Sequence, residues 1–301
     1  MLWFSRPLPN FLTIGRDFEA NTSHNWSIRS FRRFPIVKLW ANRRAKGGQQ
    51  RVARFKGVGL VVDRLIVDEI LRATISGATK PFVCRLNDDQ LYVLKGRSAQ
   101  ARGCIAEVVA AALGRAFSLP IPSFALADVP LPLVEAMPEA RSSLGHGVAF
   151  ASQYVDGLQP LSISAMGPSW EHTLARVFLF DHWIMNEDRT GTEHGGNPNL
   201  FFRSERQDVV VIDHNLAFDP TYNPENNVKL HICREFWHQT SQDMLQLTIL
   251  KSEMLEVLGS LESVFECLPA EWIDMEPAFI PKIEETLHRC ERDQFWSEIK
   301  W

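Results

Sequence analysis

The sequence predicts an α+β fold in which a β-rich segment with one helix precedes a mostly helical segment. Short apolar runs joined by polar turns occur at residues 81–96 and 199–213, a pattern typical of β-hairpins. Apolar residues recur at helical spacing in 100–117 and 169–189, and the pattern is again helical from about residue 228 onward. Strands are therefore expected mainly in the first half of the chain and helices mainly in the second.

The composition is that of a globular protein with a substantial core. Of 301 residues, 45% are hydrophobic and 23% are charged, which allows one large domain or two lobes. The net charge is −4, but residues 1–56 hold 12 Lys and Arg against 2 Asp and Glu. This basic arm shows no sustained period. It is interpreted as a loosely packed segment, or as a contact for nucleic acid or an acidic partner.

Cysteine usage and hydropathy predict a cytoplasmic protein. The five cysteines are scattered, no CxxC motif occurs, and the odd count leaves at least one thiol unpaired. This pattern is typical of buried thiols in a reducing compartment. No run of 18 apolar residues is present, so no membrane span is expected.

The elements of the β-rich segment follow one another from about residue 60. The first hairpin is expected to turn at residues 87–89, which are Asn-Asp-Asp. The helix at 100–117 has small residues on the side opposite its apolar stripe, so it is expected to pack closely on two sides. Prolines interrupt 119–133, which is expected to form an edge strand with loops, and 148–157 is expected to form a further strand.

The helical segment opens with a long predicted helix at 169–189. The second hairpin follows, and its turn is expected at residues 204–207. Beyond it the helical pattern runs almost to the end of the chain, with one proline-containing interruption.

Two charged residues of the β-rich segment are candidates for binding a nucleotide. Lys95 ends a strand, and Glu107 lies on the next helix, on the side that carries the small residues. A strand lysine paired with a glutamate of the next helix is the arrangement that kinases use to aim the lysine at phosphates. Taken alone, Lys95 is more readily interpreted as a surface lysine with a buried stem.

Three polar residues flank the second hairpin. Asp188 follows the long helix, Asn199 precedes the first strand, and Asp213 ends the second strand. Carboxylate and amide oxygens suit Mg²⁺, and a carboxylate can accept the proton of an acceptor hydroxyl. Singly, these residues are also ordinary turn formers, or an ion pair of Asp188 with Arg189. Their order behind Lys95 and Glu107 favours a site for phosphoryl transfer.

Two further motifs of the sequence are weaker. Ser76, Gly77, Thr79 and Lys80 lie in SGATKP and offer hydroxyl and backbone N–H groups to a phosphate. His231, Cys233 and His238 fit no common zinc spacing, so a satisfied core is expected there.

Several of these motifs together resemble the HipA-like kinases, in particular the short group that consists of the kinase core alone, and more distantly the phosphoinositide kinases. The resemblance runs from about residue 60 to 290, and its most specific parts are FDHWIMNEDR and IDHNLAF. It implies a two-lobed protein-kinase-like fold, with a small β-rich N-lobe at 57–158, a mostly helical C-lobe at 159–301, and ATP and Mg²⁺ between them.

The resemblance also implies roles for the candidate residues. Lys95 would be the nucleotide lysine with Glu107 as its partner, and Ser76 to Lys80 would approximate the phosphate loop. Some relatives phosphorylate an aminoacyl-tRNA synthetase, so a protein Ser or Thr is the expected acceptor.

In the family pattern, Asp188 would be the catalytic carboxylate, and Asn199 and Asp213 would hold Mg²⁺. The chain departs from the family here, because the run TGTEHGGNP lengthens the stretch between Asp188 and Asn199 beyond the usual spacing. Asn197 could then compete for the metal. If Asn199 is misplaced, the alternative is an inactive kinase-like scaffold that binds a partner or nucleic acid through its basic arm.

Overall fold

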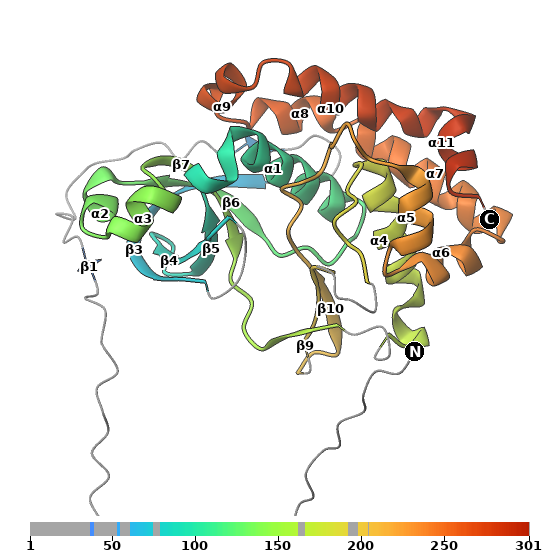
Figure 1. The fold of residues 1–301 in the computed structure, drawn as a ribbon, viewed down its shortest axis with the longest axis horizontal. Coiled ribbons are helices and arrows are strands. Elements are labelled where there is room, and N and C mark those ends of the chain that lie inside the picture. The colour runs from blue at the N-terminus through green and yellow to red at the C-terminus, as the bar shows by residue number, and fades with distance from the viewer. Residues whose placement is uncertain are drawn as a thin grey trace, which may run out of the picture. The chain divides into compact units, whose positions relative to one another are not determined.

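The structure is a computed structural model that describes residues 37–38, 53–54, 61–74, 79–161, 166–191, 198–203 and 205–300 (Figure 1). Its strands are β1 (Val37–Lys38), β2 (Ala53–Arg54), β3 (Val61–Ala73), β4 (Phe82–Leu86), β5 (Leu91–Lys95), β6 (Phe124–Val129), β7 (Gly147–Gln153), β8 (Leu158–Pro160), β9 (Leu200–Arg203) and β10 (Asp208–Val211). Its α-helices are α1 (Gln100–Ala116), α2 (Leu131–Glu135), α3 (Pro138–Ser143), α4 (Glu171–Trp183), α5 (Pro224–Leu230), α6 (Arg234–Thr240), α7 (Met244–Leu258), α8 (Leu261–Glu266), α9 (Ala270–Met275), α10 (Phe279–Leu287) and α11 (Asp293–Glu298).

Five strands of the β-rich segment close into a small barrel. They follow one another in the order β3, β4, β5, β7, β6, and β6 returns to β3 in a parallel pairing that runs from Asp63↔Ala125 to Ile66↔Asp128. All other pairings in the ring are antiparallel. The inward side chains of these strands form a hydrophobic core inside the ring. Closure leaves these strands without a free edge for most of their length.

The predicted hairpins at 81–96 and 199–213 are confirmed as β4–β5 and β9–β10. The edge-strand prediction for 119–133 is wrong, because β6 pairs with β7 on one side and with β3 on the other. The prolines of this run lie before and after Phe124–Val129, so no ladder hydrogen bond is lost inside the strand.

The β-rich segment contains more helix than the sequence predicted. Its proline-containing run 130–138 supplies the starts of α2 and α3, each with proline in its first turn, where the missing N–H costs nothing. The sequence pattern also assigned no element to 61–73, which forms the long strand β3.

Two short strands of the basic arm 1–56 pair with β3. Val37 lies opposite Ile70, and Ala53 lies opposite Val62. The remainder of the arm lies outside the described residues, so the interpretations of the arm as loosely packed or as a nucleic-acid contact stay predictions.

Helix α1 is buried on both of its sides, as its small residues predicted. Ala110, Ala111 and Gly114 are all buried, and so is Glu107. The helix contacts β7 of the barrel on one side and α8 and α9 on the other, and Figure 1 shows it between the barrel and the C-terminal helices. It shares one continuous hydrophobic core with α4 and with the helices at the end of the chain.

Helix α4 ends earlier than the predicted helix at 169–189. Trp183 is its last residue, and Met185 adopts a left-handed φ of 51°, which a helix does not continue through. Residues 186–191 therefore leave the helix as a loop, and this loop carries Asp188.

The structure also bears on the cysteines and on membrane-spanning segments. All five cysteines are free, four of them buried. Among the described residues, no helix is long and apolar enough to cross a membrane.

Candidate active site

A cavity of about 450 Å³ lies against the inner end of the barrel and the loops that flank β9 and β10. Its apolar lining includes Val93, Ile121, Phe150, Leu158, Phe201 and Val211. The predicted site residues among its lining are Thr79, Lys95, Glu107, Asp188, Asn199 and Asp213. Positions that lie far apart in the chain are thus brought to one place.

Lys95 is paired with two carboxylates inside this cavity. As the last residue of β5 it points to α1, and its ammonium group donates to Glu107 Oε1 and to Asp213 Oδ1, the latter at 2.6 Å. Only 8% of Lys95 is exposed. Burial by itself lowers the pKa of Lys95, but the two carboxylates outweigh burial and raise the pKa above its usual value. Lys95 is therefore charged at every ordinary pH.

The two carboxylates respond to this cation differently. Burial raises the pKa of Glu107, and Lys95 opposes that rise without cancelling it. Burial also acts to raise the pKa of Asp213, but there Lys95 prevails and the pKa is lowered. Glu107 Oε2 additionally accepts the backbone N–H of His214 at 3.3 Å, which ties α1 to the chain just after Asp213.

Asn199 lies next to Asp188 despite the lengthened spacing between them. The Asn199 Nδ2 donates to Asp188 Oδ2 at 3.1 Å. Both Asn199 and Asp213 adopt left-handed backbone conformations, with φ of 46° and 63°, which Asn and Asp tolerate better than other residues with a side chain. Asn197, the competing candidate, lies outside the described residues.

The donor atoms at this place suit a hard cation that is shared with a phosphate ligand. Because the amide nitrogen of Asn199 donates to Asp188, its amide oxygen is the atom that a cation would contact. Asp213 uses Oδ1 for Lys95, and Oδ2 is the other oxygen of this carboxylate. Among the described residues, no group of three His, Cys, Asp or Glu is placed to hold a metal. Mg²⁺ commonly takes only one or two protein oxygens and completes its shell with phosphates and water.

The residues predicted for the phosphate loop are only partly brought to the site. Ser76 and Gly77 lie outside the described residues. Thr79 lines the cavity, whereas Lys80 is exposed, has a φ of 45° and does not line it.

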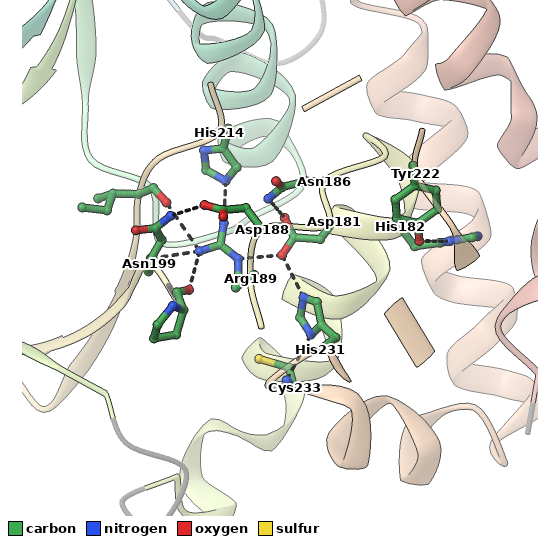
Figure 2. A network of polar contacts seen from close by, with 12 residues as sticks. Asp181, His182, Asn186, Asp188, Arg189, Asn199, His214, Tyr222, His231 and Cys233 are labelled. Atoms are coloured by element: carbon green, nitrogen blue, oxygen red, sulfur yellow. Dashed lines mark hydrogen bonds and ion pairs between the residues drawn. The ribbon is translucent and has the colours of Figure 1, made fainter. Parts of the chain in front are cut away.

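A buried polar network beneath the cavity was not predicted (Figure 2). Arg189 does not pair with Asp188 in it, as one interpretation proposed; its Nε donates to Asp181 Oδ2 at 2.6 Å. Asp181 also accepts from Asn186 Nδ2 at 2.8 Å and from His231 Nε2 at 3.0 Å. Burial acts to raise the pKa of Asp181, but Arg189 and His231 lower it well below its usual range.

The sequence contained one signal for this network. Asp181 follows Val177 and Phe178 at helical spacing, so a carboxylate falls on the apolar side of α4 and needs a buried partner.

His231 belongs to the core, as expected from its failure to fit a zinc spacing. Its Nδ1 accepts the backbone N–H of Cys233 at 3.0 Å, so the ring proton is on Nε2 and is donated to Asp181.

The model of the HipA-like kinases matches residues 67–299. A search of curated proteins found no match. Among solved structures, the Helicobacter pylori proinflammatory kinase CtkA is 11% identical with a TM-score of 0.42, covering 76% of this chain and 94% of that one. The Golgi casein kinase with Mn/ADP bound is 11% identical with a TM-score of 0.39, covering 83% of this chain and 73% of that one.

The two structural similarities are distant, so the assignment depends on the family model. That match includes all five residues predicted to carry the chemistry, which are Lys95, Glu107, Asp188, Asn199 and Asp213. Because it spans most of the sequence, the chain belongs to the HipA-like kinase family.

Proposed function

We propose that this protein is a kinase that transfers the γ-phosphate of ATP, with a Ser or Thr hydroxyl of a protein as the acceptor. The observation that carries the proposal is the meeting of Lys95, Glu107, Asp188, Asn199 and Asp213 at one cavity. In this proposal residues 57–158 and 159–301 act as two lobes that hold the nucleotide between them, and the basic arm 1–56 precedes them.

The cavity supports nucleotide binding by its size and its lining. A volume of about 450 Å³ is within the usual range of small-molecule sites. Its apolar walls suit a flat base, and Lys95 supplies a fixed positive charge for the α- and β-phosphates. Glu107 orients that charge from α1. Thr79 is available from the segment between β3 and β4.

Asn199 and Asp213 would hold Mg²⁺ through their side-chain oxygens. The bound ion would neutralise charge on the phosphates during transfer. Asp213 stays ionised because Lys95 lowers its pKa, so it keeps its negative charge for the cation over the neutral pH range.

Asp188 would act on the acceptor hydroxyl. Its Oδ2 is held by the amide of Asn199, which fixes the carboxylate beside the proposed metal position. In this position Asp188 accepts the hydroxyl proton as the new phosphate ester bond forms and the bond to the leaving ADP breaks.

Calorimetric titration of Mg-ATP beside a transfer assay tests these roles. In the Asp213→Asn variant, Mg-dependent ATP binding is expected to weaken together with turnover, because a charge is removed from the metal position. The Asp188→Asn variant is expected to bind Mg-ATP almost normally and to lose transfer by about 10²–10⁴-fold, the range typical of a lost general base.

A separate experiment identifies the acceptor. The protein is incubated with labelled ATP and a lysate, and the labelled product is identified by mass spectrometry.

Asp156→Asn is a matched control, because Asp156 is an exposed aspartate that does not line the cavity. It should leave both measurements unchanged. Loss of binding in Asp188→Asn with normal binding in Asp213→Asn would show that the two roles are exchanged. A wild-type protein that binds no Mg-ATP would refute the kinase proposal and favour an inactive scaffold.

A further inference from the structure

One buried side chain beneath the cavity contacts the backbone on both sides of the proposed metal position. Arg189 is 1% exposed. Besides Asp181, its guanidinium donates from Nη1 to the carbonyl oxygens of Pro198 and Asn199, both at 2.9 Å, and to that of Ile212 at 3.4 Å. Its Nη2 lies 3.2 Å from His214 Nε2, the atom that accepts because Nη2 can only donate.

These acceptors lie beside the residues that the proposed function needs. The carbonyl oxygens of Pro198 and Asn199 lie directly before β9, whereas Ile212 and His214 are the two neighbours of Asp213. Arg189 itself follows Asp188 directly in the chain. We propose that Arg189 is the positioning residue that sets the mutual distances of Asp188, Asn199 and Asp213, and thereby the geometry of the metal position. This inference rests on the proposed function.

The two backbone segments need such support. Asn199 and Asp213 both occupy left-handed conformations, which persist only where surrounding contacts hold them. The guanidinium supplies those contacts in one plane, because it presents five N–H donors in a rigid fork. A lysine ammonium carries three donors at a single point and cannot reach acceptors that are spread around the group in this way.

Asp181 connects this positioning group to the rigid part of the fold. It lies on α4 within the continuous core, and it balances the buried charge of Arg189. Asn186 and His231 donate to the same carboxylate, so its orientation is fixed from three directions (Figure 2). Through Arg189, the backbone at Asn199 and beside Asp213 is therefore held in place relative to α4.

The test measures the metal-dependent part of ATP binding and needs no turnover. Calorimetry gives the Kd of ATP in EDTA and in Mg²⁺, and the Kd in EDTA divided by the Kd in Mg²⁺ reports how well the metal position is formed. The Arg189→Lys variant keeps the charge but loses the fork. Its ratio is expected to fall by about 10–100-fold, the usual effect of changing a group that orients metal ligands. ATP binding in EDTA, which depends on Lys95, should change by less than about threefold.

Arg176→Lys is the matched control for replacing a buried arginine of the same region. Arg176 lies on α4, is 6% exposed, donates to the carbonyl oxygen of Phe117 at 2.7 Å and stacks on the Phe117 ring. Its partners are Phe117 and Glu253, neither of which lies in the segments around Asn199 or Asp213. Both variants should lose thermal stability, but only Arg189→Lys should lose the Mg²⁺ effect.

A second variant decides the matter if Arg189→Lys does not fold. His214→Leu removes the acceptor of Nη2, keeps an apolar side chain against Phe180 and keeps the backbone N–H that bonds Glu107. Its ratio should fall by about threefold or more. A folded Arg189→Lys with the wild-type ratio overturns the inference, as does a wild-type ratio in His214→Leu when Arg189→Lys is unfolded. A wild-type protein without any Mg²⁺ effect overturns the proposed function as well, so the two failures can be told apart.

Discussion

At the scale of single residues, the site depends on one buried cation shared by two carboxylates. Lys95 contacts Glu107 on α1 and Asp213 just beyond the end of β10. The buried charges of these three groups stabilise one another only when all three are present, because removing one partner leaves a buried charge without compensation. With Lys95, Glu107 and Asp213 all ionised, this cluster carries one net negative charge, which a bound divalent cation would offset.

A double-mutant cycle tests whether Lys95 and Glu107 form one unit. Lys95→Met should reduce ATP affinity by far more than a surface substitution, whose effect is typically within about 0.5 kcal/mol. Glu107→Gln should cost less, because Asp213 still holds the ammonium group. The double variant should show a clear interaction energy, on the order of 0.5–3 kcal/mol, when ATP affinity is measured by calorimetry. Small and strictly additive effects would contradict the pairing.

At the scale of elements, the connection from β5 to α1 places Lys95 against Glu107. Gly96 follows Lys95, and the backbone there runs so close to Leu144 that a Cβ atom would lie 2.1 Å from the Leu144 carbonyl oxygen. The same carbonyl accepts the N–H of Arg97 at 2.8 Å. A residue with a side chain cannot replace Gly96 without moving this junction.

The Gly96→Ala variant is therefore expected to be destabilised by about 1–3 kcal/mol, the usual cost of forcing extra atoms into a packed region. Because Lys95 is adjacent, ATP affinity should fall as well. Urea unfolding and calorimetry measure the two effects. Gly167→Ala is the control, since a Cβ atom at Gly167 meets no atom within 4 Å. Equal stability of the two variants would show that the junction yields easily.

The loop after Asp188 is held at both ends, which explains how the long spacing still delivers Asn199. Thr190 forms an isolated antiparallel β-bridge with His231, and the N–H of Ile232 donates to the carbonyl oxygen of Arg189 at 3.1 Å. The chain is next described at Pro198, where Arg189 holds the carbonyl oxygen. The described chain is thus fixed at Thr190 and again at Pro198, and Asn199 lies beside Asp188.

At the scale of the whole molecule, the core encloses histidines that remain neutral. Burial lowers the pKa of His182 and of His214 to about 3 each. Arg289 adds to this effect at His182, and Arg189 adds to it at His214. In the unfolded chain a histidine titrates near pH 6.5. Below about that pH the unfolded state binds protons that the folded state does not bind.

Stability is therefore expected to fall as the pH is lowered from about 6.5 toward 3, by up to about 1.4 kcal/mol per pH unit for each such histidine. Urea unfolding at pH 7, 6 and 5 measures this slope. His182→Gln should make the slope shallower, whereas His146→Gln, at an exposed histidine, should leave it unchanged. An unfolding midpoint that does not vary between pH 7 and 5 would contradict the prediction.

The sequence by itself determined the parts of the molecule that local patterns encode. The two hairpins, helix α1 with its two buried sides, and the order of the charged and polar residues could be predicted, because alternation, helical spacing and turn residues act over short stretches of chain. The pairing of Lys95 with Glu107 also followed, since they lie on consecutive elements. The family resemblance then supplied the proposed roles of Asp188, Asn199 and Asp213.

Only the tertiary structure decided what depends on partners far apart in the chain. β6 is an inner strand because β3, which comes much earlier in the chain, closes the barrel on it, and nothing local to β6 encodes that partner. The same holds for Arg189. Its acceptors are Asp181, the carbonyl oxygens directly before β9, the Ile212 carbonyl oxygen directly after β10, and His214. A buried guanidinium is placed by the groups that surround it, and those groups converge only when the whole chain has folded.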